Sequence, residues 1–92
     1  MRVIEYKASF KRALKKLPPD DRSNVKQAVK SFLLAMEAGQ LPTGLGLKRL
    51  YEDRWEIRAD IRLRVCFRMA KDLIEFALVG DHEMIKNYLK NL

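Results

Sequence analysis

The spacing of apolar residues divides the chain into three segments. Residues 1–7 alternate loosely, apolar residues then recur every three or four positions as far as residue 39, and they recur at every other position from residue 47. Recurrence every three or four positions is that of one face of an α-helix, and recurrence at every other position is that of one face of a β-strand. The pattern therefore predicts a short strand over residues 1–7, then a helical segment, and then a segment made mainly of strands.

Two helices are expected between Ser9 and Gly39. The prolines at 18–19 separate them, because proline cannot donate the helical hydrogen bond. Asp20 or Asp21 is placed to cap the second helix, and Gly39 supplies the left-handed residue that often ends one. Since the linker is so short, the helices are expected to form an antiparallel hairpin. Their apolar stripes are Phe10, Ala13, Leu14 and Leu17, and then Val25, Ala28, Val29, Phe32 and Met36.

Four more strands and a last helix are expected after a loop at residues 40–46. The strands are expected at 47–51, 55–60, 62–69 and 73–79. The last of these reads LIEFALV, which is typical of a central strand covered on both faces. Asp81 is placed to cap a final helix that reaches Leu89. The order β-α-α-β-β-β-β-α predicts an α+β fold, one domain over residues 1–92, with an antiparallel-rich twisted sheet packed by the helical hairpin.

The polar sides of two neighbouring strands carry a row of arginines. The helices need an apolar partner, so they are expected to cover the other sheet face and to leave the arginine face at least partly open. Closely spaced arginines repel one another unless acidic side chains or bound anions lie between them. Glu56, Asp60 and Glu75 are placed to form such ion pairs, and phosphate groups are the alternative partner. The row consists of Arg58, Arg62, Arg64 and Arg68.

Charge and composition narrow the class of partner. The formal net charge of +7 on 92 residues favours a polyanion such as nucleic acid, or an acidic protein. No apolar run approaches the roughly 20 residues of a membrane helix, so no membrane partner is expected. The single cysteine, Cys66, excludes an internal disulfide and suits the cytoplasm. Together with the single histidine it cannot form a usual zinc site, so neither a metal nor a cofactor is expected.

His82 and Tyr88 are the candidate acid–base groups. An unperturbed histidine titrates at about pH 6.5 and can give or take a proton near neutrality. The hydroxyl of Tyr88 would need cationic neighbours to act as a base, and core packing is its alternative role. Cys66 is expected to be a packed, unreactive side chain.

Three short segments, in this order of elements, resemble the RelE/ParE toxin superfamily. They are Trp55-Glu56-Ile57-Arg58, Arg64-Val65-Cys66-Phe67, and Val79-Gly80-Asp81-His82 with Tyr88 beyond. RelE-like members are small basic toxins that cleave messenger RNA in the ribosomal A site without metal. ParE-like members share the fold and poison DNA gyrase, and an antitoxin segment folded across the toxin neutralises both kinds.

The resemblance also implies roles for particular residues. Arg58 and Arg64 would hold the phosphate, His82 would act as general acid, and the base stays open among Tyr88, His82 and Glu56. Further contacts to RNA or antitoxin would come from Lys48, Arg49, Arg62 and Arg68. The resemblance implies a cognate antitoxin, the ribosome and messenger RNA as partners. Two alternatives remain: a gyrase inhibitor without chemistry, and a non-toxic protein that binds its antitoxin.

Overall fold

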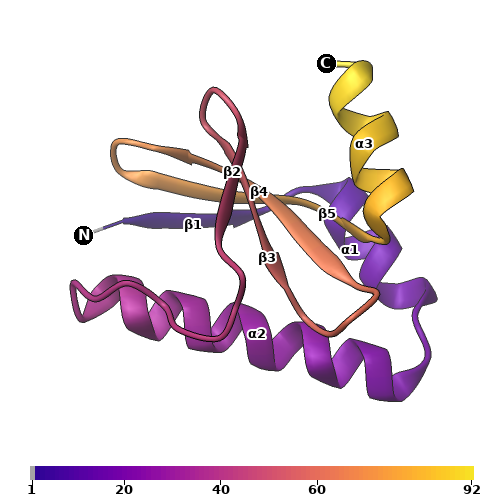
Figure 1. Ribbon diagram of the computed structural model, residues 1–92, viewed down its shortest axis with the longest axis horizontal. Coiled ribbons are helices and arrows are strands. Elements are labelled where there is room, and N and C mark those ends of the chain that lie inside the picture. Colours follow the sequence, from indigo (N-terminus) through magenta and orange to yellow (C-terminus); the bar gives the residue numbers. More distant parts are fainter. Residues whose placement is uncertain (1) are drawn as a thin grey trace.

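A computed structural model describes residues 2–92 as a five-stranded sheet with three helices (Figure 1). The elements are β1 (Val3–Tyr6), α1 (Ala8–Lys16), α2 (Pro19–Glu37), β2 (Lys48–Tyr51), β3 (Arg54–Arg58), β4 (Arg64–Ala70), β5 (Leu73–Gly80) and α3 (His82–Lys90). The predicted order and the α+β class are confirmed, and Met1 of the predicted first strand lies outside the described residues. Within residues 2–92 no helix has the length and apolarity to span a membrane.

The sheet order is β1-β5-β4-β3-β2, with β5 in its interior as its apolar sequence predicts. The pairs β2–β3, β3–β4 and β4–β5 are antiparallel, whereas β1 runs parallel to β5. A one-residue bulge leaves Ala77 unpaired between Phe76 and Leu78. The Ala77 carbonyl accepts a hydrogen bond of 2.5 Å from the hydroxyl of Ser9, which ties α1 to β5.

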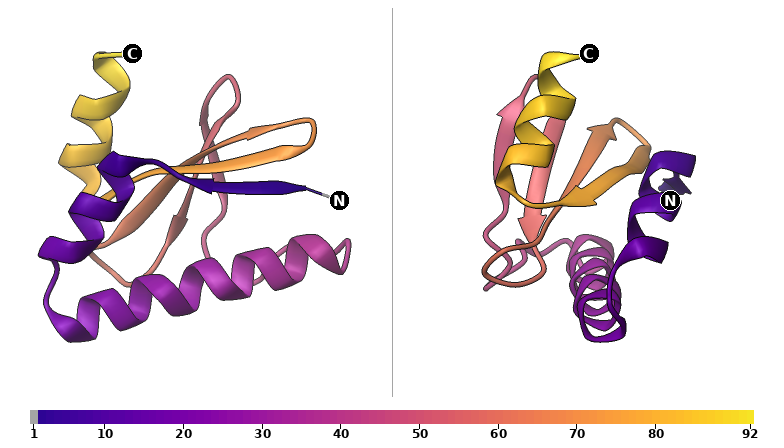
Figure 2. Two further views of the ribbon diagram at one scale, coloured as in Figure 1. Left: turned by 180° about the vertical axis from the view of Figure 1, so that it is seen from behind. Right: turned by 90° about the vertical axis from the view of Figure 1, so that its right-hand side faces the viewer.

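Helices α1 and α2 cover one sheet face, and α3 lies against the other (Figure 2). The core between α1, α2 and the sheet centres on Phe10, Phe32, Phe67 and Phe76. On the opposite face Ile85 of α3 is buried. A side chain at Gly80 would come within 2.9 Å of Met84, so glycine permits the close approach of α3 to β5.

The prediction that α1 and α2 form an antiparallel hairpin is wrong. In both views of Figure 2, α1 crosses α2 steeply, and each helix packs on the sheet separately. Leu17 and Pro18 are both extended, with ψ angles of 149° and 156°, so the chain turns away from the axis of α1 before α2 starts. The short linker therefore places α2 at a steep angle to α1 rather than antiparallel to it.

Two predicted helix starts are also wrong. Helix α1 begins at Ala8 rather than Ser9, and Pro18 occupies the N-cap of α2. Asp20 and Asp21 lie in the first turn of α2, where their negative charge is favourable near the helix N-terminus. The predicted cap at Asp81 is confirmed, since its carboxylate accepts a hydrogen bond of 2.9 Å from the Met84 amide.

Candidate functional site

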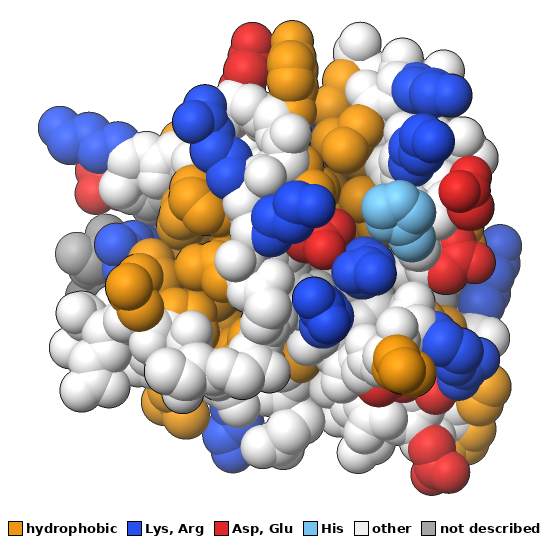
Figure 3. All heavy atoms as spheres, viewed as in Figure 1, with side chains coloured by type: hydrophobic (Ala, Val, Ile, Leu, Met, Phe, Trp, Pro, Cys, Tyr) orange, Lys and Arg blue, Asp and Glu red, His pale blue; other side chains and the backbone are white. Residues whose placement is uncertain are grey.

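The sheet face opposite α1 and α2 carries the charged residues in three cross-strand rows. The rows are Arg58, Arg64 and Gly80; then Lys48, Glu56, Cys66 and Leu78; then Arg54, Arg68 and Glu75. Lys and Arg side chains gather around the single histidine on the view in Figure 3. The predicted arginine face therefore exists, and α3 covers part of it.

Three of the predicted catalytic residues lie at the same end of this face in the strand register. Arg58 lies opposite Arg64 in the register, and Arg64 lies opposite Gly80, two residues before His82. Arg58 and His82 are exposed, and His82 is the first residue of α3. We name Arg58, Arg64 and His82 the Arg–His cluster. Two arginines and a histidine thus lie at one end of the sheet, with Arg58 and His82 exposed to solvent.

A carboxylate from the next row holds Arg64 in place. Its Nη1 lies 3.2 Å from Oε2 of Glu56, a residue only 5% exposed. The Nε atom of Arg64 is buried and has no hydrogen-bond partner. A buried donor without a partner costs about 1–3 kcal/mol, so an acceptor reaching this guanidinium would recover part of that cost.

Arg68 of the third row forms two ion pairs. Arg68 lies between Asp53 and Glu75, each 3.4 Å away, and the hydrogen bond to Glu75 raises the pKa of Arg68. The expected neutralising role is thus found for Glu56 and Glu75. Asp60 has a different role, because its carboxylate accepts hydrogen bonds from the backbone amides of residues 62 and 63 at 2.7 and 2.8 Å. Those two hydrogen bonds lower the pKa of Asp60.

Two predicted contact residues lie off the arginine face. Strand β4 begins at Arg64, so Arg62 belongs to the preceding turn, and its guanidinium is 3.7 Å from Asp21 of α2. Arg49 pairs with Trp55, whose side chain packs against the core, and its Nε donates to the Glu52 carbonyl at 2.6 Å. Lys48, by contrast, is exposed in the middle row of the face.

Tyr88 does not join the Arg–His cluster. Burial raises its pKa above the ordinary 10.0, although the charges of Arg54 and Arg68 lower it. The charged groups that act on it are Arg54, Glu75 and Arg68 of the third row and Cys66 of the middle row, and none of them belongs to the Arg–His cluster. The third row is four residues along the strands from the first, or about 13 Å. The cationic neighbourhood expected for Tyr88 is present, but burial outweighs it, and a base role near Arg64 is not supported by this placement.

Arg54 is a residue of this face that sequence reasoning missed. It lies opposite Arg68 and is one of the charges that act on Tyr88. The signal was present, because Arg54 alternates with Glu56 and Arg58 on the same side of one strand.

Cys66 is unreactive in the folded protein. It is fully buried, and burial raises the pKa of its thiol from 9.0 to about 11. A raised pKa means that the folded state favours the thiol. The resulting stability is present below pH 9.0 and is lost as the pH rises through about 11.

The reactivity of Cys66 can be tested by alkylation. At pH 8, iodoacetamide should modify native Cys66 at least about 100-fold more slowly than the unfolded chain. The two rates are measured by mass spectrometry, and equal rates would contradict the expectation.

The loop before β2 positions Arg58. The Arg58 amide donates to the Leu45 carbonyl at 2.7 Å, and a side chain at Gly46 would come within 3.0 Å of the Arg58 Nε atom. Gly46 and Gly44 both have positive φ, of +61° and +76°, but a side chain at Gly44 would meet nothing within 4 Å.

This difference makes the two glycines a matched pair for experiment. Gly44→Ala and Gly46→Ala should each cost about 1–2 kcal/mol, since both force alanine into a left-handed conformation. Only Gly46→Ala should also displace the Arg58 guanidinium. On the sequence-based expectation that Arg58 contacts RNA, this displacement should weaken binding of a single-stranded RNA oligonucleotide by about tenfold. Chemical denaturation measures the first effect and fluorescence anisotropy the second. Equal RNA affinities of the two variants would show that Gly46 does not position Arg58.

Solved structures show which fold this is. No protein-family model matches the sequence, and no curated protein matches it. The structure, however, matches crystal structures of toxins bound to antitoxins over almost its whole length, and the chain has the RelE-like toxin fold.

Three complexes illustrate the match. The RelB-RelE antitoxin-toxin complex from Methanococcus jannaschii gives a TM-score of 0.70 at 21% identity, covering 91% of this chain and 96% of that one. The DinJ-YafQ complex of E. coli gives 0.71 at 17%, covering 92% and 98%. The intact RelBE toxin-antitoxin complex of E. coli gives 0.62 at 17%, covering 88% and 96%.

Proposed function

We propose that this protein is the toxin of a toxin–antitoxin pair and that it cleaves messenger RNA on the ribosome without a metal ion. The observation that carries the proposal is the Arg–His cluster on a RelE-like fold: two opposed arginines with an exposed histidine beside them. The net charge of +7 favours an RNA substrate and an acidic antitoxin.

In the proposed reaction the 2′-hydroxyl of the RNA attacks the adjacent phosphate. The bond from the 2′-oxygen to phosphorus forms and the bond to the 5′-oxygen breaks, leaving a cyclic phosphate and a 5′-hydroxyl. Arg58 and Arg64 bind the non-bridging oxygens and offset the charge that develops there. His82 donates its proton to the departing 5′-oxygen.

The reaction also needs a base that takes the proton of the 2′-hydroxyl. Within residues 2–92, neither Glu56 nor Tyr88 is free beside the Arg–His cluster. Glu56 is buried and paired with Arg64, and Tyr88 lies beside the third row. We assign the base to a group that the ribosome or its bound RNA presents.

The test compares exposed residues, whose replacement leaves the core intact. Arg58→Ala and His82→Ala should each slow cleavage of a short messenger on programmed ribosomes by about 10²- to 10⁴-fold. Arg12→Ala, an equal loss of charge on the outside of α1, is the control and should cleave normally. The product is read by mapping 5′ ends, in vitro and after induction in cells.

Other outcomes would favour the alternatives. Growth arrest with intact RNA and impaired supercoiling would replace this proposal with gyrase inhibition. Full viability on expression of the protein alone would leave only antitoxin binding. Equal cleavage by the wild type and both cluster variants would remove the Arg–His cluster from the mechanism.

A further inference from the structure

Each cross-strand row of the charged face leaves one cation without a carboxylate partner. On β4, Arg64 is paired with Glu56. Further along the same strand, Arg68 is paired with Asp53 and Glu75. No ion pair within residues 2–92 involves the cations that β2 and β3 contribute to these rows. The unpaired cations are Arg58 in the first row, Lys48 in the middle row and Arg54 in the third.

The three unpaired cations, which we name the cation line, follow the β2–β3 half of the face. Neighbouring rows are two residues apart along a strand, or about 7 Å, so the line is about 13 Å long. Arg58 and Lys48 are exposed and Arg54 is half-buried. Helix α3 packs mainly on β4 and β5, the other half of the sheet. Like charges side by side repel one another, so a polyanion bound along the line would be stabilising.

An exposed tyrosine lies at the far end of the cation line. Tyr51 of β2 is opposite Arg54 in the register, so it belongs to the third row, and it is 58% exposed. In a regular strand Arg49 and Tyr51 would share a face, but a register shift lies between them. Their partners on β3 are the adjacent residues Trp55 and Arg54, which point to opposite faces. The shift therefore turns Tyr51 toward the charged face.

The hairpin turn next to Tyr51 is held by hydrogen bonds from β2 and β4. Glu52 has a φ of +50°, a left-handed conformation that residues with a side chain adopt at a cost in stability. The Glu52 carbonyl accepts a hydrogen bond of 2.6 Å from Nε of Arg49. The Asp53 carbonyl accepts one of 2.8 Å from the Met69 amide. These bonds fix the turn and, with it, the end of β2 that carries Tyr51.

We propose that Tyr51 and Arg54 bind a nucleotide of the RNA that flanks the cleaved phosphate. The strand runs along the cation line from Arg58 to Arg54, with a phosphate on each guanidinium and a base stacked on the Tyr51 ring. Every base has a face that can stack on an aromatic ring, so this subsite accepts any sequence. The assignment rests on the proposed function in taking RNA as the ligand, but neither residue takes part in the proposed chemistry.

The cation line continues directly from the Arg–His cluster, and this favours a single strand of the substrate as its occupant. The substrate extends on both sides of the cleaved phosphate, so its flanking nucleotides must lie on the surface beside the cluster. A duplex is a poor occupant, because its bases are stacked on one another and cannot reach the Tyr51 ring.

The two residues should affect the binding of a short single-stranded RNA in different ways. Tyr51→Leu removes the ring and should weaken binding at least about fivefold at every salt concentration. Tyr51→Phe keeps the ring and should bind as the wild type does. Arg54→Gln removes one phosphate contact, so the slope of log K against log salt should become shallower by about 0.7. Fluorescence anisotropy over a range of salt concentrations measures both effects.

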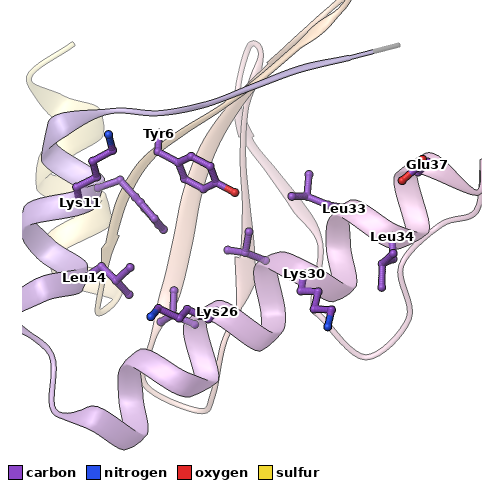
Figure 4. Close-up of a pocket in the computed structure, with 11 residues that line it drawn as sticks. Tyr6, Lys11, Leu14, Lys26, Lys30, Leu33, Leu34 and Glu37 are labelled. Carbon is purple, nitrogen blue, oxygen red and sulfur yellow. The ribbon is translucent and has the colours of Figure 1, made fainter.

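Lys30→Gln is the matched control for charge. Lys30 is exposed on α2, on the other side of the sheet, where it borders an apolar hollow of about 520 Å³ (Figure 4). Its replacement removes the same charge as Arg54→Gln and should leave the salt slope unchanged. The length of the RNA gives a second control. Affinity should rise steeply once the strand reaches from Arg58 to Tyr51, and Tyr51→Leu should lose this rise.

Binding is measured without ribosomes or cleavage, so the subsite and the proposed function can fail separately. Cleavage on ribosomes together with wild-type RNA affinity of Tyr51→Leu would overturn the subsite and keep the function. The expected binding pattern without cleavage would keep the subsite and remove the function. The subsite would also be overturned if the wild type bound no RNA, or if Lys30→Gln changed the slope as much as Arg54→Gln. Equal weakening of a glutamate-rich peptide by Tyr51→Leu would assign the cation line to a protein partner instead.

Discussion

Replacing Arg64 with methionine should both destabilise the protein and abolish cleavage of RNA. Methionine keeps the aliphatic packing but leaves Glu56 buried without its partner 3.2 Å away. Breaking a buried ion pair in this way costs about 3 kcal/mol. Loss of the guanidinium that would hold the phosphate should reduce cleavage at least about 10²-fold. Denaturant unfolding and cleavage on programmed ribosomes measure the two effects.

A second substitution separates the two roles of Arg64. The variant Arg64→Met/Glu56→Leu removes both charges and should be within about 1 kcal/mol of the wild type, because apolar pairs often replace buried ion pairs without loss. It should still fail to cleave RNA. A double variant that is stable and fully active would exclude Arg64 from the chemistry. A single variant as stable as the wild type would show that Glu56 does not need its partner.

Replacing Phe76 with alanine should have the largest effect on stability. Phe76 is fully buried, and its ring centroid lies 5.3 Å from that of Tyr6, 5.8 Å from Phe10, 5.7 Å from Phe67 and 6.5 Å from Phe32. It thus connects β1, α1, α2 and β4 through one side chain. Removing such a ring costs about 4 kcal/mol, a large part of the total stability of a small domain.

The free energy of unfolding is measured in guanidinium chloride. In a separate thermal unfolding experiment, the midpoint should fall by about 20 °C. Phe76→Leu should recover about half of the loss, since it restores much of the buried volume. Leu41→Ala, at a position 82% exposed, should change stability by less than about 0.5 kcal/mol. A loss below about 1 kcal/mol for Phe76→Ala would mean that the aromatic cluster does not hold the fold together.

Much of the architecture could be predicted because periodicity is a local property. The alternation in β4 places Val65 and Phe67 on one face and Arg64 and Arg68 on the other, and the structure agrees. Helix α2 ends at Glu37, two residues before Gly39, where φ is +68°, and this follows from local sequence in the same way.

Features that depend on how elements meet could not be predicted from periodicity. The alternation continues back to Arg62, but the carboxylate of Asp60 binds two amides and delays the start of β4 until Arg64. Tyr88 has the spacing of a core residue on α3, and only the direction of α3 across the sheet decides which arginines it approaches. Leu33 and Leu34 lie beside the predicted apolar stripe of α2, so periodicity did not indicate that they line a surface hollow.

The parallel pairing of β1 with β5 bears on how the chain folds while it is being synthesised. Val3 and Tyr6 take Leu73 and Phe76 as their register partners, so β1 cannot join the sheet until β5, about 70 residues later in the chain, has been synthesised. Contacts between residues this far apart form late and slow the folding of a small protein. The nascent chain therefore cannot assemble the sheet that carries the Arg–His cluster while residues 73–80 are still inside the ribosome that makes it.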